Sequence, residues 1–283
     1  MSLALSAGII TFVPRERTRL KSIELQEHAL RENSLTPAGA GKIRGVRGFT
    51  TNGTYGKIGR TAMGPLKQRQ YSDTEPWLLS GALRRSLMLG VMIDGLCLKR
   101  EVSVFPNGRK ALVVSSDARL DESAPPSAAV LIYDSENNLR IGAYTIAPQA
   151  LVEAMGESLT IAVVESMPIV LALIHYPEVF AGRDVVWFED NSNALGAMVK
   201  GGSNSPMLDR SSMVTTLLSA NLRCRIWWEY IQSESNWSDS CSRLLSLCPW
   251  VSAHDFFGGG AGASHLAVVV SHRDIFGPRP VCF

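Results

Sequence analysis

Apolar residues in the first third of the chain recur at roughly helical spacing. Residues 15–32 are rich in charge, and their apolar positions predict an amphipathic surface helix. These positions are Leu20, Ile23, Leu25 and Leu30. A second helix is predicted from Pro37 to about Phe49, and a third, capped by residues 73–76, from Trp77 to about Leu96. We therefore expect residues 1–100 to be all-helical.

The pattern changes after residues 105–108. The segments 111–116, 128–133 and 139–146 are short apolar runs typical of strands. The polar residues 134–138, between the second and third runs, are typical of a hairpin turn. We expect these three strands to form an antiparallel meander.

Helices and strands alternate through most of the remaining sequence. A long helix is predicted over 158–176, shorter helices over 192–200, 206–221 and 237–247, and strands over 185–188 and 224–231. This order predicts an α/β fold with a mixed five-stranded sheet, flanked by helices and containing parallel pairs. Beyond residue 249 the chain is rich in Gly and Pro, and we expect a loosely attached tail with one strand-like run at 266–270. The predicted parts are residues 1–105, 106–248 and 249–283.

The composition is that of an ordinary globular protein, with 46% hydrophobic and 19% charged residues. Five cysteines without a CxxC pair favour reduced thiols and an intracellular location, in the cytoplasm or nucleus. The sequence has no apolar run of the ~18 residues that a membrane-spanning helix needs. Its mildly apolar start has no basic leader. We therefore expect neither membrane association nor a secretory signal.

The charge of the chain is unevenly divided. Residues 1–110 carry 18 Lys and Arg against 8 Asp and Glu, a net charge of +10, and the remainder carries 10 against 18, a net charge of −8. The segment 33–72 holds seven basic residues and no acidic one. This asymmetry favours a polyanion-binding part beside a metal-binding part, although two halves that neutralise each other would also produce it.

Four carboxylates stand at positions where a sheet fold would gather them. Asp117 and Asp190 each end an apolar run, Glu165 lies within an apolar helical pattern, and Asp239 opens a short polar helical pattern. A buried carboxylate is costly unless it is paired, and hard divalent cations choose oxygen ligands. Two strands and two helices would each supply one carboxylate, and this suggests a two-metal site that cleaves phosphodiesters.

Each carboxylate also has a structural interpretation. Asp117 would serve as a turn residue, Glu165 as a solvated helix position and Asp239 as an acid favoured at a helix N-terminus. Glu189 competes with Asp190, because strand alternation sends these neighbours to opposite faces.

The order of elements and these acidic positions together resemble the ribonuclease H fold. The stretch 165–173 resembles the family's ELxA…AL pattern, and Asp190-Asn191 resembles its aspartate turn after the fourth strand. The stretch 236–243, Asn-Trp-Ser-Asp-Ser-Cys-Ser-Arg, resembles the N-x-x-D-x-x-S-R motif of retroelement ribonuclease H domains. The resemblance covers about residues 110–247. Residues 35–45, 56–62 and 65–69 look, more loosely, like the thumb and tether of DIRS-like reverse transcriptases, without their Tyr-x-Asp-Asp polymerase signature.

The resemblance implies a metal-dependent endonuclease that cuts the RNA strand of RNA–DNA hybrids, with the polymerase part of a reverse transcriptase as a partner. It implies two Mg²⁺ ions, for which Mn²⁺ can substitute. Asp117 would bridge the ions, and Glu165 and Asp190 would complete the coordination sphere of one ion. Asp239 would hold the other ion, which activates water. Nucleic-acid contacts are expected after the fourth strand and in the basic segment: Asn191, Ser192, Asn193, Lys42, Arg44, Arg47, Arg60, Arg69 and Arg243.

Other functions are compatible with the same pattern. Transposases and 3′–5′ exonucleases share this fold and its carboxylate chemistry. Exonucleases need Asp-x-Glu on the first strand, where this chain has Asp117-Ala-Arg119. A catalytically decayed retroelement copy would bind nucleic acid without cutting it. Many ribonucleases H carry a loop histidine that assists product release, and here the loop after Ile231 holds Glu234 instead.

Overall fold

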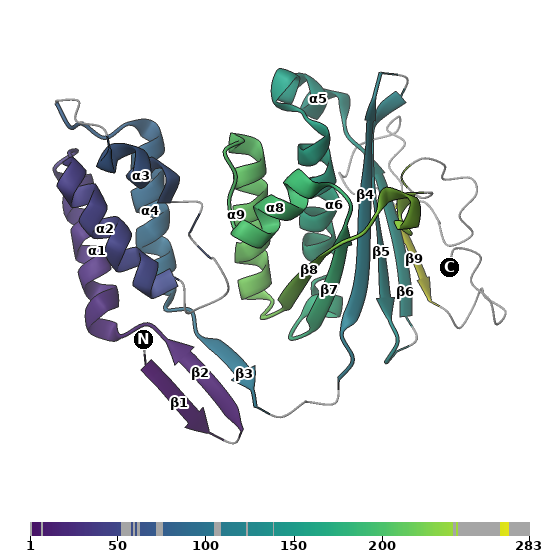
Figure 1. The fold of residues 1–283 in the computed structure, drawn as a ribbon, viewed down its shortest axis with the longest axis horizontal. Coiled ribbons are helices and arrows are strands. Elements are labelled where there is room, and N and C mark those ends of the chain that lie inside the picture. Colours follow the sequence, from purple (N-terminus) through teal and green to yellow (C-terminus); the bar gives the residue numbers. More distant parts are fainter. Residues whose placement is uncertain are drawn as a thin grey trace. The chain divides into compact units, whose positions relative to one another are not determined.

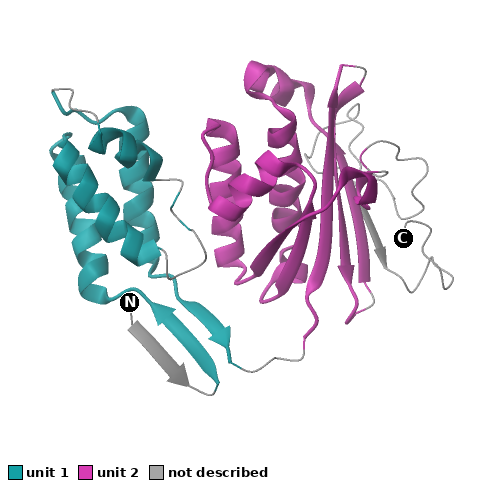
Figure 2. Cartoon of the chain, in the orientation of Figure 1, with its two compact units in different colours: residues 1–108 teal, residues 109–283 magenta. Residues whose placement is uncertain are grey.

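The chain divides into two compact units, residues 1–108 and residues 109–283 (Figure 2). The structure is a computed structural model. It describes residues 2–6, 8–51, 58, 60, 63–71, 76–104, 109–122, 124–137, 139–239, 242 and 267–271. Among these residues, none of the helices is both long enough and apolar enough to span a bilayer.

Helices make up most of the described part of the first unit (Figure 1). They are α1 (Glu16–Arg31), α2 (Pro37–Thr51), α3 (Gly64–Gln70) and α4 (Gly81–Leu96). The three helices predicted in this part are present, but α4 begins four residues later than expected. Ser80 caps it by accepting a hydrogen bond from the Leu83 backbone N–H at 3.2 Å. The preceding residues are extended, because Leu78 forms a β-bridge with Ser34.

The helices of the first unit enclose a small apolar core with a polar network beside it. Asp94 on α4 accepts hydrogen bonds from the Gln26 side chain at 3.1 Å and from the Thr50 hydroxyl at 2.9 Å. Gly90 makes room for this network, since a Cβ there would stand 1.8 Å from Gln26 Oε1. The core residues are Ala29, Leu35, Ala40, Ile43, Leu66, Leu83 and Leu87.

Arg47 belongs to this interior, so the prediction that it contacts nucleic acid is wrong. Its side chain is 0% exposed, and it donates to the Ser86 carbonyl at 3.4 Å. Burial lowers the pKa of Arg47 to about 10, although nearby Asp94 acts in the opposite direction. Helical spacing explains the error, because Arg47 shares one face of α2 with buried Ile43 and Thr50.

The expectation of an all-helical first unit is also wrong. Strands β1 (Ser2–Ser6), β2 (Ile9–Val13) and β3 (Arg100–Ser103) form an antiparallel sheet in the order β1-β2-β3. Strands β2 and β3 pair although helices α1 to α4 lie between them in the sequence, with Phe12 opposite Arg100. A strand of five residues whose partner lies beyond several helices has a weak local signal, since its pairing is decided by tertiary contacts.

The second unit is built on one mixed sheet. Its strands are β4 (Leu112–Asp121), β5 (Ala124–Asp134), β6 (Leu139–Ile146), β7 (Asp184–Glu189), β8 (Arg225–Tyr230) and β9 (Ala267–Ser271), in the order β8-β7-β4-β5-β6-β9. The β4–β5–β6 meander is antiparallel, whereas β7 pairs in parallel with both β4 and β8. The predicted ribonuclease H-like sheet of five strands, β4 to β8, is confirmed. The strand-like run of the tail adds β9, antiparallel to β6.

Helices cover this sheet around a core centred on Trp187. They are α5 (Gln149–Met155), α6 (Ile161–His175), α7 (Pro177–Phe180), α8 (Ser192–Lys200) and α9 (Pro206–Asn221). Helix α6 packs on β4 and β5, and α8 packs on β7 and β8 (Figure 1). The Trp228 ring lies 5.6 Å from that of Trp187, whereas neighbouring Trp227 is 68% exposed, as strand alternation predicts. The sequence pattern missed the short helices α5 and α7.

A buried ion pair lies where β5 ends and turns into β6. Both terminal nitrogens of the Arg183 guanidinium donate to the Asp134 carboxylate, at 2.8 and 3.1 Å. Burial by itself would raise the pKa of Asp134, but hydrogen bonds from Arg183, Asn137 and the Glu136 backbone lower it to about 2. The pair joins the end of β5 to the start of β7.

We expect Asp134→Asn to lower the free energy of unfolding by about 3–5 kcal/mol, because it removes the buried partner of a buried guanidinium and leaves only the more exposed Glu136, at 3.5 Å, as an acidic partner. Since the folded pKa is depressed, the stabilisation is present above pH ~4 and is lost as the pH falls towards 2. Denaturant titrations between pH 7 and pH 2 measure both effects. Asp184→Asn is the control, because its partner Arg225 lies in a half-exposed pair, worth at most about 1 kcal/mol. Equal losses in the two variants would contradict the prediction.

Candidate metal centre

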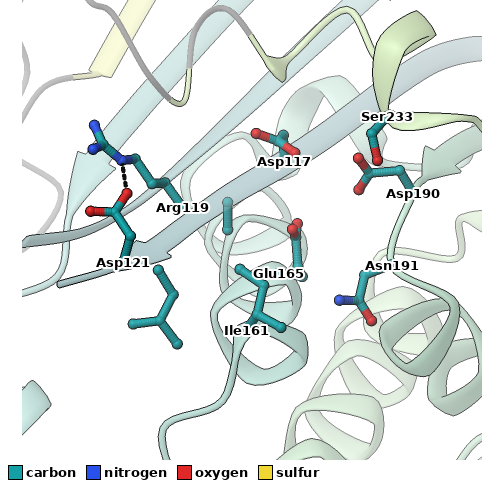
Figure 3. Close-up of a pocket in the computed structure, with 10 residues that line it drawn as sticks. Asp117, Arg119, Asp121, Ile161, Glu165, Asp190, Asn191 and Ser233 are labelled. Carbon is teal, nitrogen blue, oxygen red and sulfur yellow. Dashed lines mark hydrogen bonds and ion pairs between the residues drawn. The ribbon is translucent and has the colours of Figure 1, made fainter. Parts of the chain in front are cut away.

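Three of the predicted acidic residues converge in the second unit. Asp117, Glu165 and Asp190 each offer a carboxylate oxygen, and these three oxygens lie within 4.8 Å of one another. Asp117 and Glu165 are buried, whereas Asp190 is half-buried. Figure 3 shows the three side chains at one pocket of about 360 Å³.

The sheet register explains why these carboxylates meet. Strands β4 and β7 run parallel, with Ser115 opposite Phe188, so Asp117 and Asp190 stand two residues further along each chain. Helix α6 packs across β4 and presents Glu165 from its second turn. The prediction that Asp117 ends its strand is wrong, because β4 continues to Asp121. Its pairing with β5 carries the strand past the site.

The electrostatics of this cluster are unfavourable without a cation. Burial raises the pKa of Glu165 well above its usual range, and the neighbouring carboxylates of Glu189, Asp117 and Asp190 raise it further. A hydrogen bond from the Ala118 backbone offsets this only in part. The second oxygen of Glu165, Oε2, is buried and has no hydrogen-bond partner among the residues that the structure describes. A divalent cation would supply the missing partner, so the residues present fit such an ion.

A fourth carboxylate beside the cluster was missed as part of this site. Glu189 is fully buried, accepting hydrogen bonds from the Ser116 hydroxyl at 2.9 Å and from the Asn191 backbone N–H at 3.3 Å. The Trp187 indole donates to the same hydroxyl at 2.8 Å. Burial raises the pKa of Glu189 well above its usual range. Strand alternation was the available signal, since it places Glu189 on the same buried face as Trp187.

Asp239 is half-buried and is not a member of the group of three carboxylates. It is nevertheless linked to that group through Ser242. The Ser242 hydroxyl donates to the Asp117 carboxylate, and it also lies 2.9 Å from the Asp239 carbonyl oxygen. The Asn-x-x-Asp-x-x-Ser stretch therefore reaches the site through its serine hydroxyl.

Buried polar contacts attach the same stretch to the sheet. The Asn236 amide donates to the Ser116 carbonyl at 2.9 Å, and its oxygen accepts from the Ser115 and Ser238 hydroxyls. On β5, the Ser127 hydroxyl donates to the Ser242 carbonyl at 2.9 Å. The sequence offered Asn236 and Ser242 only as parts of a motif, and the structure shows what they contact.

The predicted nucleic-acid contacts after β7 lie at the start of α8. Asn191 lines the pocket, but its side-chain oxygen caps α8 by accepting from the backbone N–H groups of Asn193 and Ala194. Ser192 and Asn193 are exposed, as is Lys200 at the other end of the helix. In the loop after β8, Ser233 lines the pocket and Glu234 is exposed.

The remaining predicted contacts lie mainly in the first unit. Lys42 and Arg60 are exposed. Arg44 donates to the Gln70 side chain at 2.6 Å, and Arg69 donates to the Leu78 carbonyl at 2.7 Å. Arg243 lies outside the described residues.

Comparison with known proteins finds likenesses to solved structures alone. No protein-family model matches the sequence, and no curated protein matches it. One similar solved structure is the N-terminal RNase H domain of a Mycobacterium tuberculosis protein, fused to maltose-binding protein, with 13% identity, 46% of this chain and 88% of that chain covered, and a TM-score of 0.38. A second is RNase H1 from the archaeon Halobacterium salinarum, with 11% identity and a TM-score of 0.37. The match covers 45% of this chain and 89% of that chain. A third is LC11-RNase H1, isolated from compost by a metagenomic approach, with 14% identity and a TM-score of 0.36. The match covers 47% of this chain and 89% of that chain.

Replacing Glu165 by Gln tests the unfavourable charge of the cluster. We expect Glu165→Gln to raise the free energy of unfolding of the metal-free protein by on the order of 1–3 kcal/mol. Because the folded pKa is raised above the ordinary 4.5, the metal-free wild type loses stability as the pH rises from there, and the variant does not. Thermal unfolding in EDTA measures this difference. Adding Mn²⁺ should raise the Tm of the wild type but not that of the variant.

The control for that experiment is Glu157→Gln, which changes an exposed glutamate just before α6. It should leave both the metal-free stability and the Mn²⁺ response unchanged. A Glu165→Gln protein that is less stable than wild type in EDTA would contradict the expected repulsion.

The hydroxyl contact to Asp117 generates a separate prediction. Ser242→Ala and Ser238→Ala each remove a buried hydroxyl and should each cost about 1–3 kcal/mol of stability. Only Ser242→Ala should also weaken the Mn²⁺-induced rise in Tm, because Ser238 does not contact Asp117 in the described hydrogen bonds. Ser242→Thr, which keeps a hydroxyl, should restore the response. Equal Mn²⁺ responses in the two alanine variants would contradict this role.

Proposed function

We propose that the chain is a metal-dependent nuclease of the ribonuclease H type that hydrolyses the RNA strand of RNA–DNA hybrids. The observation that carries the proposal is the convergence of Asp117, Glu165 and Asp190, whose ligand oxygens lie within 4.8 Å of one another. Glu165 Oε2 is buried and accepts no hydrogen bond from the described part of the chain, which supports a cation there, because buried carboxylate oxygens are normally satisfied. The ribonuclease H-like order of the sheet supports the type of nuclease.

Mg²⁺ is the proposed ion, because it uses few carboxylates and keeps several waters. Asp117 would be a ligand of both of two ions. Glu165 and Asp190 would be further ligands of one ion, and Asp239 would be a ligand of the other. Paired divalent ions in such a site activate the attacking water and stabilise the charge on the leaving oxygen. A protein side chain acting as general base is then unnecessary.

The protein contributes orientation and a partly dry site. Asp117 and Glu165 are 3% and 4% exposed, so their carboxylates cannot turn freely into solvent. The Ser242 hydroxyl fixes Asp117 from one side. Half-buried Asp190 stands between Glu189 and Asn191, which are joined by a hydrogen bond, and it faces the pocket where substrate would enter. Preorganised ligands of this kind lower the cost of reaching the transition state.

Substrate recognition is proposed to depend on the shape of the hybrid rather than on its base sequence. Proteins read such duplexes through phosphates, 2′-hydroxyls and the wide minor groove. Exposed Ser192 and Asn193 follow Asp190 directly and are suited to that role. Exposed Lys42 and Arg60 of the first unit would add contacts to phosphates.

We further propose that this nuclease is part of a retroelement reverse transcriptase and acts with its polymerase part. Support comes from the retroelement-like stretch 236–243, whose Asn236 and Ser242 side chains make the contacts with β4 described above. The resemblance of residues 35–69 to a thumb and tether is a second, looser support.

Incubation with a labelled RNA–DNA hybrid and Mg²⁺ or Mn²⁺ tests this function. The full chain should cut the RNA strand, and Asp117→Asn should reduce the rate at least about 100-fold, because it removes a proposed ligand of both ions. EDTA should abolish cutting. Glu157→Gln is the control, since Glu157 is exposed and is not among the described residues that line the pocket.

Each other result of this assay has a meaning. Cutting of duplex DNA in place of the hybrid would identify a transposase-like enzyme, and stepwise removal of 3′ nucleotides an exonuclease. Salt-sensitive binding without cutting would identify a decayed copy. Undiminished activity in Asp117→Asn would reject the proposed site.

A further inference from the structure

A basic residue borders the carboxylate pocket. Arg119 lines it together with Asp117, Glu165 and Asp190, and it is the one basic side chain among the described lining residues. It was not among the predicted nucleic-acid contacts. Figure 3 shows Arg119 beside Asp121, to one side of Asp117.

The geometry of β4 brings Arg119 to this pocket. Side chains alternate along a strand, so Asp117 and Arg119 point to the same face, about 6.7 Å apart along the chain. Between Arg119 and Asp121 the pairing with β5 shifts register in a β-bulge. Bulges locally change the direction of side chains and recur next to active sites. Here the bulge stands where the strand leaves the carboxylates.

The Arg119 guanidinium is held at the mouth of the pocket. Its Nε donates to the Asp121 carboxylate, and the two side chains are 30% and 40% exposed. A guanidinium carries five N–H donors in a rigid fork, which suits both a carboxylate and a phosphate. The ion pair with Asp121 therefore orients the fork while part of it faces solvent.

The positive charge of Arg119 suits it to bind a polyanion. A cluster of three carboxylates repels a polyanion, and cations at the pocket can bind only part of the charge of a nucleic-acid strand. We propose that Arg119 binds a backbone phosphate of the strand to be cut, next to the phosphate that lies at Asp117, Glu165 and Asp190. This inference rests on the proposed nuclease function and adds a substrate-binding residue to it.

Binding and kinetics of the Arg119 variants test the inference. Affinity for a labelled RNA–DNA hybrid is measured by fluorescence anisotropy in EDTA, over a series of salt concentrations, and KM and kcat are measured with Mn²⁺. Arg119→Ala should weaken binding about tenfold at low salt and reduce the slope of log affinity against log salt by about 0.9, the loss of one phosphate contact. KM should rise while kcat stays within about threefold. Arg119→Lys should keep the salt slope and recover part of the affinity.

Arg109→Ala is the matched control. Arg109 is likewise an arginine paired with an acid, Glu136, but it precedes the opposite end of β4 and does not line the pocket. Its loss should change neither the affinity nor the slope. Unfolding curves of both variants check that they are folded.

Two results would overturn the inference in distinguishable ways. If wild type cuts the hybrid and Arg119→Ala binds it like Arg109→Ala, the phosphate contact is wrong and the nuclease function stands. If wild type neither binds nor cuts any nucleic acid, the proposed function fails and the contact fails with it.

Discussion

Repulsion among carboxylates is the constraint on which the second unit depends. Three ligand oxygens within 4.8 Å, two of them on buried side chains, would move apart if their supports were loose. The supports are rigid, because Asp117 is inside a paired strand, Glu165 is on a helix packed against that strand, and Asp190 follows its parallel neighbour. The fold therefore holds an arrangement that is unfavourable without a cation.

Polar contacts behind the carboxylates complete this support. On one side, Trp187, Ser116 and Glu189 form a buried hydrogen-bonded chain that ends at the backbone of Asn191. On the other side, the Ser242 hydroxyl donates to Asp117. Such networks are costly when one member is unsatisfied and specify a single geometry when all are satisfied. This explains why so many serines are buried next to a hydrophobic core.

The sequence predicted the second unit much better than the first. Its strands carry apolar or alternating runs, and the first three follow one another closely, so local patterns suffice. The β2–β3 pairing was missed for the opposite reason, since it joins segments far apart in the sequence. Arg47 was mispredicted although its helical spacing from Ile43 and Thr50 places it on the buried face of α2. Strand and helix positions pointed to Asp117 and Glu165, and the resemblance to the ribonuclease H turn selected Asp190 over Glu189, although Asp117 lies within its strand rather than at its end. The role of Ser242 required coordinates, because a hydroxyl contact over 125 residues leaves no periodic trace.

The residue two places after Asp117 separates the competing nuclease types. Strand alternation puts position 119 on the same face as Asp117, so a glutamate there would add a carboxylate to the cluster, as the Asp-x-Glu pair of exonucleases requires. Arg119 does the reverse, because it brings a positive charge to the pocket and is held there by Asp121. A pocket with three converging carboxylates and an arginine at its rim suits the proposed contact with a phosphate next to the cut. An endonuclease must hold backbone beyond the scissile phosphate, and Arg119 is suited to one such contact, whereas an exonuclease would need a glutamate in its place.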